Sequence, residues 1–145
     1  MPLLNPWKSY KQTATLTASP GQVVLLLFNG AISRLERSLL GFSYDDPAML
    51  NMTVNNNVLR AQEIIRELNC ALDMERGGEL AGTLRRLYHY FDVRLCQCNY
   101  KKEREGIEEV IGHLTVLRDA WDTMLKNPEG TFVPESVSAP AFATV

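Results

Sequence analysis

Hydrophobic and polar residues recur with a helical period over four long segments of the chain. These segments span about residues 20–40, 47–75, 79–100 and 105–126, and glycine or proline residues separate several of them. In the last three segments, apolar positions recur mostly at alternating spacings of three and four, the pattern of a helix-bundle seam. Short connections between such helices make neighbours antiparallel. We therefore predict an all-α fold, an antiparallel up-down four-helix bundle over residues 19–126.

Residues 16–32 hold the clearest start signal of the predicted helices. Ser19 suits the N-cap, Pro20 suits the first helical position, and Gln22 stands where the partner residue of a capping box belongs. Large apolar residues then fill every position of 23–28. A helix that is apolar over so much of its circumference is buried on several sides or awaits a partner.

Two flanks lie outside the predicted bundle. Residues 1–18 hold scattered large apolar side chains, and we predict that they form a strap or short helix laid on the bundle. Residues 127–145 hold three prolines and many small residues, a composition that forms no core of its own. We therefore predict a flexible, disordered tail there. The chain divides into a strap (1–18), a bundle domain (19–126) and a tail (127–145).

Composition and charge exclude several classes of protein. The chain has 145 residues and a formal net charge of −2, which argues against the clustered basic surface of a nucleic-acid-binding protein. No apolar run approaches the roughly 20 residues that cross a bilayer, and the first residues include no apolar run of signal-peptide length. We predict a cytoplasmic protein that neither binds nucleic acid nor inserts into a membrane.

The chain has three cysteines, Cys70, Cys96 and Cys98, without Cys-x-x-Cys spacing. An odd number with this spacing fits a reducing compartment and no disulfide framework. Cys96 and Cys98 are two residues apart in a predicted helix, so they point to different sides and do not share a metal. We interpret the cysteines as small, partly buried hydrophobic residues.

Candidate catalytic groups are few. His89 and His113 both lack the glutamate, three residues earlier, that a di-metal site in a helix bundle uses. Glu109 and His113 lie four residues apart on one helix face, and Asp73 and Glu75 lie near a helix end. Neither pair has a second catalytic group in view, so we interpret both pairs as structural. We predict no enzyme activity, no cofactor and no metal site.

Four motifs follow one another along the chain. They are Asn5-Pro6-Trp7 with Tyr10-Lys11-Gln12, then LTASPGQVVLLLFNGAI (16–32), RAQEIIRELNCALDMERGGELAGTLRRLYHY (60–90) and VIGHLTVLRDAW (110–121). In this order and with these spacings, they resemble the motifs of the flagellar secretion chaperone FliS family, over about residues 5–125. The chain departs from the family pattern at Phe28-Asn29, where the family usually has Tyr-Asp.

The resemblance implies a function without covalent chemistry. Members of this family bind the disordered C-terminal segment of flagellin in the cytoplasm and keep it from polymerising early. They also help to deliver it to the flagellar export gate, which the resemblance implies as a second partner. The flagellin segment wraps around the bundle as short helices in apolar grooves, a recurring mode of peptide recognition. An apolar first helix suits such a protein, because a chaperone exposes apolar surface that an ordinary monomer avoids.

The candidate partner-binding residues come from the apolar faces and the N-terminal flank. The first helix has two stripes, one with Val24, Leu27, Phe28 and Ala31 and the other with Leu25, Asn29, Ile32 and Leu39. One stripe is core and the other contacts the client, and the sequence leaves open which is which. Tyr88 and Tyr90 suit a groove, because a buried hydroxyl needs a partner, whereas the leucines and Phe91 of the later helices fit core as well as groove. The predicted partner-binding residues are Tyr10, Leu16, Leu25, Phe28, Asn29, Ile32, Leu68, Leu72, Leu84, Leu87, Tyr88 and Phe91.

Two alternatives stay open on the sequence alone. In the first, the chain is a structural or adaptor bundle whose excess apolar face forms a homodimer in the absence of a client. In the second, it is a small all-helical enzyme that uses Glu109 and His113, or Asp73 and Glu75.

Deletion of residues 1–15 tests the predicted strap. We expect the helix content to stay intact, because these residues lie outside the bundle, and the affinity for the client to change, because a strap beside a groove covers it when it is empty. Circular dichroism and calorimetric titration measure the two quantities. An unchanged affinity would contradict the strap.

Overall fold

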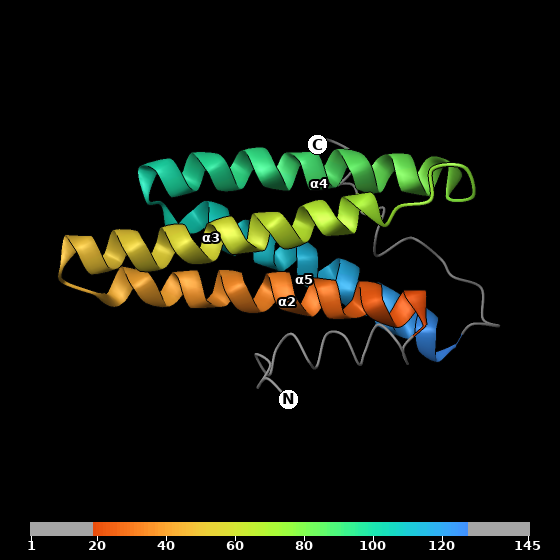
Figure 1. Cartoon of the computed structure of the whole chain (residues 1–145), viewed down its shortest axis with the longest axis horizontal. Coiled ribbons are helices and arrows are strands. Elements are labelled where there is room, and N and C mark those ends of the chain that lie inside the picture. Colours follow the sequence, from red (N-terminus) through yellow and green to blue (C-terminus); the bar gives the residue numbers. More distant parts are fainter. Residues whose placement is uncertain (1–18, 128–145) are drawn as a thin grey trace, which may run out of the picture.

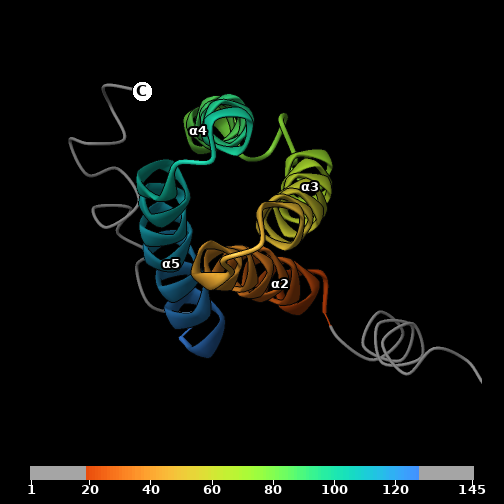
Figure 2. The same ribbon diagram turned by 90° about the vertical axis from the view of Figure 1, so that its left-hand side faces the viewer.

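The computed structural model describes residues 19–127, which form a ring of four helices (Figures 1 and 2). The helices are α2 (Pro20–Leu40), α3 (Pro47–Cys70), α4 (Gly78–Lys101) and α5 (Arg104–Lys126), and a short 3-10 turn, η1 (Gly41–Ser43), follows α2. Successive helices run in opposite directions, and α5 packs back against α2 at an oblique angle (Figure 1). No strand occurs within the described residues. The predicted all-α four-helix bundle is confirmed, while the predicted strap (1–18) and almost all of the tail (127–145) lie outside these residues.

The helix starts that the sequence predicts are present in the structure. The backbone N–H of Gln22 donates to Ser19 Oγ at 3.2 Å, and the backbone N–H of Ser19 donates to Gln22 Oε1 at 3.3 Å, which completes the capping box. At the start of α3, Asp46 Oδ1 accepts from the backbone N–H of Ala48 at 3.1 Å. Both caps are local interactions, which is why the sequence alone reveals them.

The end of α3 differs from the prediction, which placed it near Glu75. The helix ends at Cys70 because the following residues form a turn around Asp73. Its carboxylate accepts from the backbone N–H groups of Glu75 at 3.1 Å and of Arg76 at 3.0 Å. Aspartate competes with the helical backbone in this way, so the turn replaces the last predicted helical turn.

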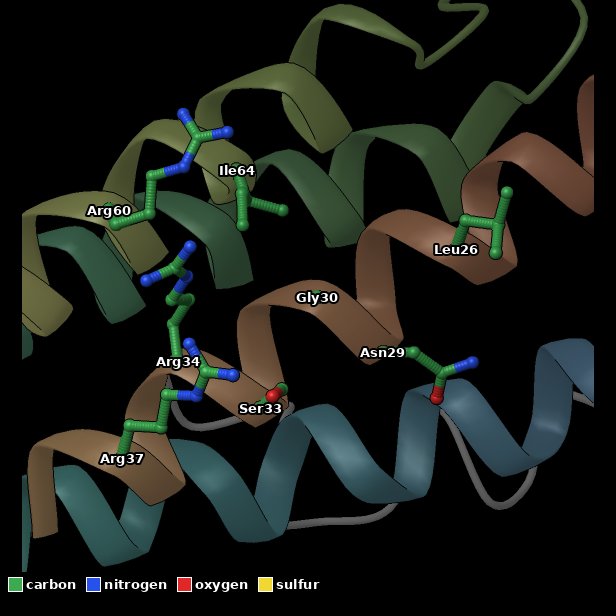
Figure 3. A pocket seen from close by; sticks show the side chains of 8 residues that line it. All are labelled: Leu26, Asn29, Gly30, Ser33, Arg34, Arg37, Arg60 and Ile64. Atoms are coloured by element: carbon green, nitrogen blue, oxygen red, sulfur yellow. The ribbon is translucent and has the colours of Figure 1, made fainter. Parts of the chain in front are cut away.

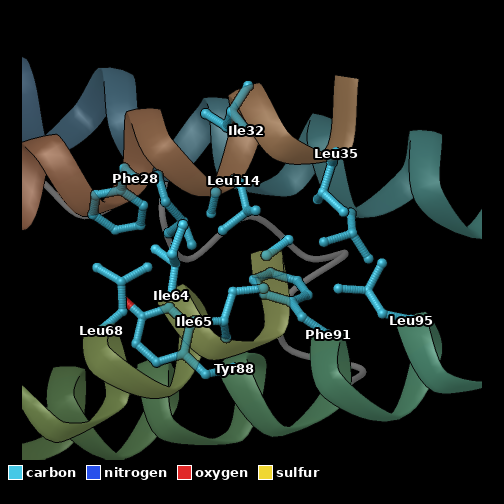
Figure 4. Close-up of a cluster of buried hydrophobic side chains, with 14 of the residues drawn as sticks. Phe28, Ile32, Leu35, Ile64, Ile65, Leu68, Tyr88, Phe91, Leu95 and Leu114 are labelled. Atoms are coloured by element: carbon cyan, nitrogen blue, oxygen red, sulfur yellow. The ribbon is translucent and has the colours of Figure 1, made fainter. Parts of the chain in front are cut away.

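The helices enclose one hydrophobic core, to which all four contribute (Figure 4). Phe28 from α2 and Phe91 from α4 are among its largest side chains, at 2% and 0% exposure. Figure 4 shows them facing side chains from α3 and α5, including Ile65 and Leu114. Within residues 19–127, every buried side-chain nitrogen or oxygen has a hydrogen-bond partner. The buried polar side chains of this part of the chain are therefore satisfied by the chain itself.

Polar contacts link α3 to α4 beside this core. The buried amide of Gln62 donates to the backbone oxygen of Asp92 at 3.2 Å and to its carboxylate at 3.1 Å. Near the other end of the pair, Asn99 Nδ2 donates to Asn55 Oδ1 at 2.9 Å. These contacts explain why poor helix formers such as Asn55 stand in the middle of α3: they join one helix to the next.

The three cysteines differ in burial. Cys98 is buried in the core, as predicted, and the burial raises the pKa of its thiol to about 11. Cys70 and Cys96 are exposed, so the prediction that they are partly buried is wrong. All three are free thiols.

Helices α4 and α5 pack closely at Gly106. A Cβ atom added there would lie 2.7 Å from Cys98 Cβ and 3.0 Å from Cys98 Sγ. Both atoms lie close to the α4 backbone, so they cannot move aside as the end of a long side chain can. Gly112, further along the same helix, is exposed and a Cβ there would meet no atom within 4 Å.

Alanine substitution at these two glycines separates close packing from helix propensity. We expect Gly106→Ala to destabilise the fold by about 1 to 3 kcal/mol through overpacking. Gly112→Ala should stabilise it by about 0.5 to 1 kcal/mol, since alanine favours the helix interior. Chemical denaturation gives both free energies of unfolding. Equal effects at the two positions would contradict the close approach.

Candidate functional site

Most of the predicted partner-binding residues lie in the core of this structure. The buried ones are each at most 7% exposed, and they are Phe28, Ile32, Leu68, Leu84, Leu87, Tyr88 and Phe91. Leu25 and Leu72 are partly buried, and Asn29 is exposed. Tyr10 and Leu16 lie outside the described residues. The contact of these residues with a partner stays a prediction. In this structure the buried ones pack in the hydrophobic core of the bundle.

The two predicted stripes of α2 do not separate as core and surface. Phe28 and Ala31 of the first stripe are buried, yet Ile32 of the second is also only 5% exposed. The reason is that α2 packs against both α3 and α5, so its buried face is wider than one stripe. Ile32 is therefore a core residue, and of the four second-stripe residues only Asn29 is fully on the surface.

The interpretation of Tyr88 as a groove residue rather than a core residue is wrong for this structure. Its side chain is 3% exposed, and its ring lies 6.3 Å from that of Phe91, measured between centroids. Burial raises the pKa of Tyr88 well above its usual value. Tyr90 is half-buried and its hydroxyl donates to Glu109. Both tyrosines therefore take part in packing or in contacts between helices.

An open groove lies between α2 and α3 on the outer surface of the bundle (Figure 3). Its volume is about 370 Å³, within the range of pockets that hold ligands. Leu26 and Asn29 lie at one end, Gly30 lies between, and at the basic end the almost fully buried Ile64 lies beside the arginines. The complete lining is Leu26, Asn29, Gly30, Ser33, Arg34, Arg37, Arg60 and Ile64. The groove thus belongs to the same apolar helix whose start the sequence marks so clearly.

The basic end of the groove brings together Arg34 and Arg37 from α2 and Arg60 from α3 (Figure 3). Arg60 pairs with Glu63 at 2.7 Å. Within residues 19–127, no carboxylate lies at ion-pair distance from Arg34 or Arg37. Partial burial lowers the pKa of Arg34, and the charges of Arg37 and Arg60 lower it further. Sequence reasoning missed this cluster, although the i, i+3 spacing of the two α2 arginines was a usable signal.

The structure accommodates both residues at which the chain departs from the family's usual Tyr-Asp, Phe28 and Asn29. Phe28 lies in the core, where a phenylalanine leaves no hydroxyl in need of a partner. Asn29 keeps a polar contact, because its side-chain oxygen accepts from Arg118 Nη1 of α5 at 3.3 Å. A neutral amide therefore links α2 to α5 at a position where an aspartate would form an ion pair.

Large apolar side chains are also exposed outside the groove. They lie on all the helices and near η1, and Tyr100 and Leu40 are the most exposed, at 89% and 67%. The others are Tyr44, Met49, Met52, Leu59, Met74, Val93 and Val116. Single exposed apolar residues are ordinary on a protein surface, so the groove remains the stronger candidate site.

The two candidate catalytic pairs both have structural roles. Asp73 forms the turn after α3. Glu109 accepts from the hydroxyl of Tyr90 and from Arg94 Nε at 3.0 Å, and its carboxylate lies 3.7 Å from His113 Nε2. The His113 ring stacks on the Phe91 ring, with 5.7 Å between the ring centroids. Within the described residues, no three metal-binding side chains form a cluster that could hold an ion. None of the helices described has the length and hydrophobicity of a transmembrane span.

Glu109 acts as a clamp between α5 and α4. Partial burial alone would raise the pKa of its carboxyl, but the hydrogen bonds from Tyr90 and Arg94 and the charges of Arg94 and His113 lower it overall. A folded-state pKa below the unfolded value of about 4.3 means that the ionised form stabilises the fold. This stabilisation is fully present above the unfolded-state pKa, and it is lost as the pH falls through the folded-state pKa.

Replacement of the Glu109 carboxylate tests the clamp. We expect Glu109→Gln to lower the free energy of unfolding by about 1 to 2 kcal/mol at pH 7, and we expect the difference from wild type to shrink below about pH 4. Denaturant titrations of both proteins at pH 7 and at a pH below about 4 measure this difference in the free energy of unfolding. Glu108→Gln is the control, since Glu108 is exposed and its distance to Arg104 is 3.8 Å, and it should change stability by less than about 0.5 kcal/mol. A difference at Glu109 that persists at low pH would contradict this account.

Comparisons with known proteins agree with the family resemblance of the motifs. The family described as flagellar protein FliS matches residues 3–128. The flagellar secretion chaperone FliS of Bacillus subtilis is 34% identical over 88% of this chain and 91% of its own length. The protein of that name from Salmonella typhimurium is 34% identical over 86% of this chain and 92% of its own. Flagellar secretion chaperone FliSB of Pseudomonas aeruginosa is 32% identical over 79% of this chain and 91% of its own. The chain therefore belongs to the FliS family of flagellar proteins.

Proposed function

We propose that the chain is a cytoplasmic chaperone that binds the disordered C-terminal segment of flagellin, prevents its premature polymerisation and helps to deliver it to the flagellar export apparatus. Its relatives are named flagellar secretion chaperones, and the family membership supports a flagellar client. The observation that carries the proposal is the open groove between α2 and α3, on a bundle whose buried polar side chains, within the described residues, are already paired. Such a molecule can receive a peptide without first rearranging its core.

The groove suits a segment that has no fold of its own. Leu26 offers an apolar contact at one end, and the arginines offer hydrogen-bond donors at the other. A disordered segment loses conformational entropy when it binds, so it needs contacts spread along a surface rather than one deep pocket. An open groove between two helices, with an apolar contact at Leu26 and hydrogen-bond donors further along, meets that need. The bound segment is then unavailable for polymerisation, and no covalent step is required.

A homodimer is the second candidate for the exposed apolar surface. The observation in its favour is the exposure of Met52 and Leu59 on α3, at 57% and 48%. In this case the mass of the chain alone would rise with concentration, as light scattering after size-exclusion chromatography would show. A constant monomer mass over a hundredfold range of concentration would remove this candidate.

Co-expression with the C-terminal segment of flagellin from the same organism tests the proposed function. We expect the two chains to co-purify as a one-to-one complex, because the segment buries apolar side chains that are otherwise exposed to water. Light scattering gives the mass of the complex. If no complex forms, the proposal fails.

A bulky side chain in the groove tests where the client binds. Ser33 is exposed and lines the groove, so Ser33→Trp places a large ring over it while the helix remains intact. We expect the affinity for the flagellin segment to fall at least about tenfold, or about 1.4 kcal/mol. Gln97→Trp is the matched control, since Gln97 is an exposed position of α4 outside the groove. Equal affinities of the two variants in calorimetric titration would place the client elsewhere.

A further inference from the structure

The basic end of the α2–α3 groove gathers positive charge that the described residues do not balance. Arg34 extends from α2 toward Arg60 on α3, and Arg37 lies one turn further along α2 (Figure 3). Glu63 pairs with Arg60 alone. Within residues 19–127, Arg34 and Arg37 have no carboxylate at ion-pair distance. Like charges this close repel one another, so the folded chain is less stable with them than it would be with neutral side chains.

Arg34 is the arginine on which the charges of the other two act. The side chain is partly buried between the helices, and burial together with the charges of Arg37 and Arg60 lowers its pKa. Guanidinium groups stay protonated nonetheless, so the cluster remains positive at all physiological pH values. A negatively charged group that entered the groove would remove the repulsion and would gain charge-assisted hydrogen bonds.

The shape of the groove indicates what carries that negative group. Its planar guanidinium donors match the two oxygens of a carboxylate, and the Ser33 hydroxyl lies in the same lining. From Leu26 at one end, the groove continues past Gly30 into the basic end, where Ile64 lies beside Arg60 (Figure 3). A ligand that fills the groove therefore has apolar side chains followed by an acid. A polypeptide has this character, whereas a free inorganic anion would use only the basic end.

We infer that Arg34 and Arg37, with Arg60, bind a carboxylate of the polypeptide that occupies the groove, either an acidic side chain or the C-terminal carboxylate. The identity of that polypeptide rests on the proposed function, which makes it the flagellin segment. The apolar contacts hold the segment, and the arginines fix its direction and its register along the groove.

A double-mutant cycle with the full chain tests the inference. The wild type and the Arg34→Gln/Arg37→Gln variant are each titrated with the flagellin C-terminal segment and with the same segment whose acidic residues are amides and whose C terminus is amidated. We expect the arginine variant to bind the native segment about tenfold more weakly than the wild type does. We expect neutralisation of the segment to weaken binding by the wild type to a similar degree but to have little further effect on the variant.

Several outcomes would overturn the inference while leaving the proposed function intact. One is that the variant binds the native segment as tightly as the wild type does. Another is an equal loss for Arg85→Gln/Arg86→Gln, a control that removes two exposed arginines from α4 and so reports only general attraction between charges. A third is binding of inorganic phosphate to the wild type at micromolar concentration, which would indicate a site for free anions.

The chain's own acidic tail is a further occupant that the experiment distinguishes. If it held the arginines, their replacement would raise the affinity for the client, and deletion of residues 128–145 would raise it equally. That result would overturn the inference. Failure of the wild type to bind the native segment at all would instead contradict the proposed function. Retained helix content and an unchanged or raised melting temperature in the arginine variant show that any loss of binding is not a loss of fold.

Discussion

The position of α2 between two neighbours governs the rest of the structure. Phe28, Ile32 and Leu35 lie on its buried face and meet side chains from the other three helices. Truncation of one such side chain typically removes about 2 to 5 kcal/mol, a large part of the stability of a small domain. Because α2 packs against α3 on one side and α5 on the other, its wide apolar surface is used without a partner. The part of α2 that faces away from the core lines the groove that it forms with α3.

The contacts around the core divide into two kinds. Apolar packing supplies most of the stability, while hydrogen bonds such as that between Gln62 and Asp92 fix how one helix is placed against the next. The groove differs from both, because its arginines gather charge that the neighbouring described residues leave largely unpaired. A fold tolerates such repulsion when its core is strong, and a local arrangement that opposes stability often marks a binding site.

The parts of the structure that depend on neighbouring residues could be predicted, and those that depend on distant ones could not. The capping box at Ser19 and the seams of the later helices follow from residues within one or two turns of each other. The end of α3 was misplaced because the Asp73 side chain forms a turn where propensity still favours a helix. Tyr88 was expected in a groove because its hydroxyl needs a partner, whereas a helix with two neighbours buries adjacent positions, the ring of Tyr88 included. The spacing of Arg34 and Arg37 is visible in the sequence, but their approach to Arg60 requires α2 and α3 to be brought together, which no local pattern reveals.

The hydrogen bond from Trp121 Nε1 to the backbone oxygen of Gly21, at 2.8 Å, joins the last helix to the first. A Cβ atom on Gly21 would lie 2.6 Å from Leu125 Cδ2, so the two ends of the bundle domain also touch directly. The described chain therefore leaves the bundle at the same pole where it enters. A mechanical pull on these two ends would act first on the contacts among Gly21, Trp121 and Leu125, and only afterwards on contacts nearer the middle of α2 and α5. The contacts among Gly21, Trp121 and Leu125 therefore guard the point at which such a pull would begin to separate the first helix from the last.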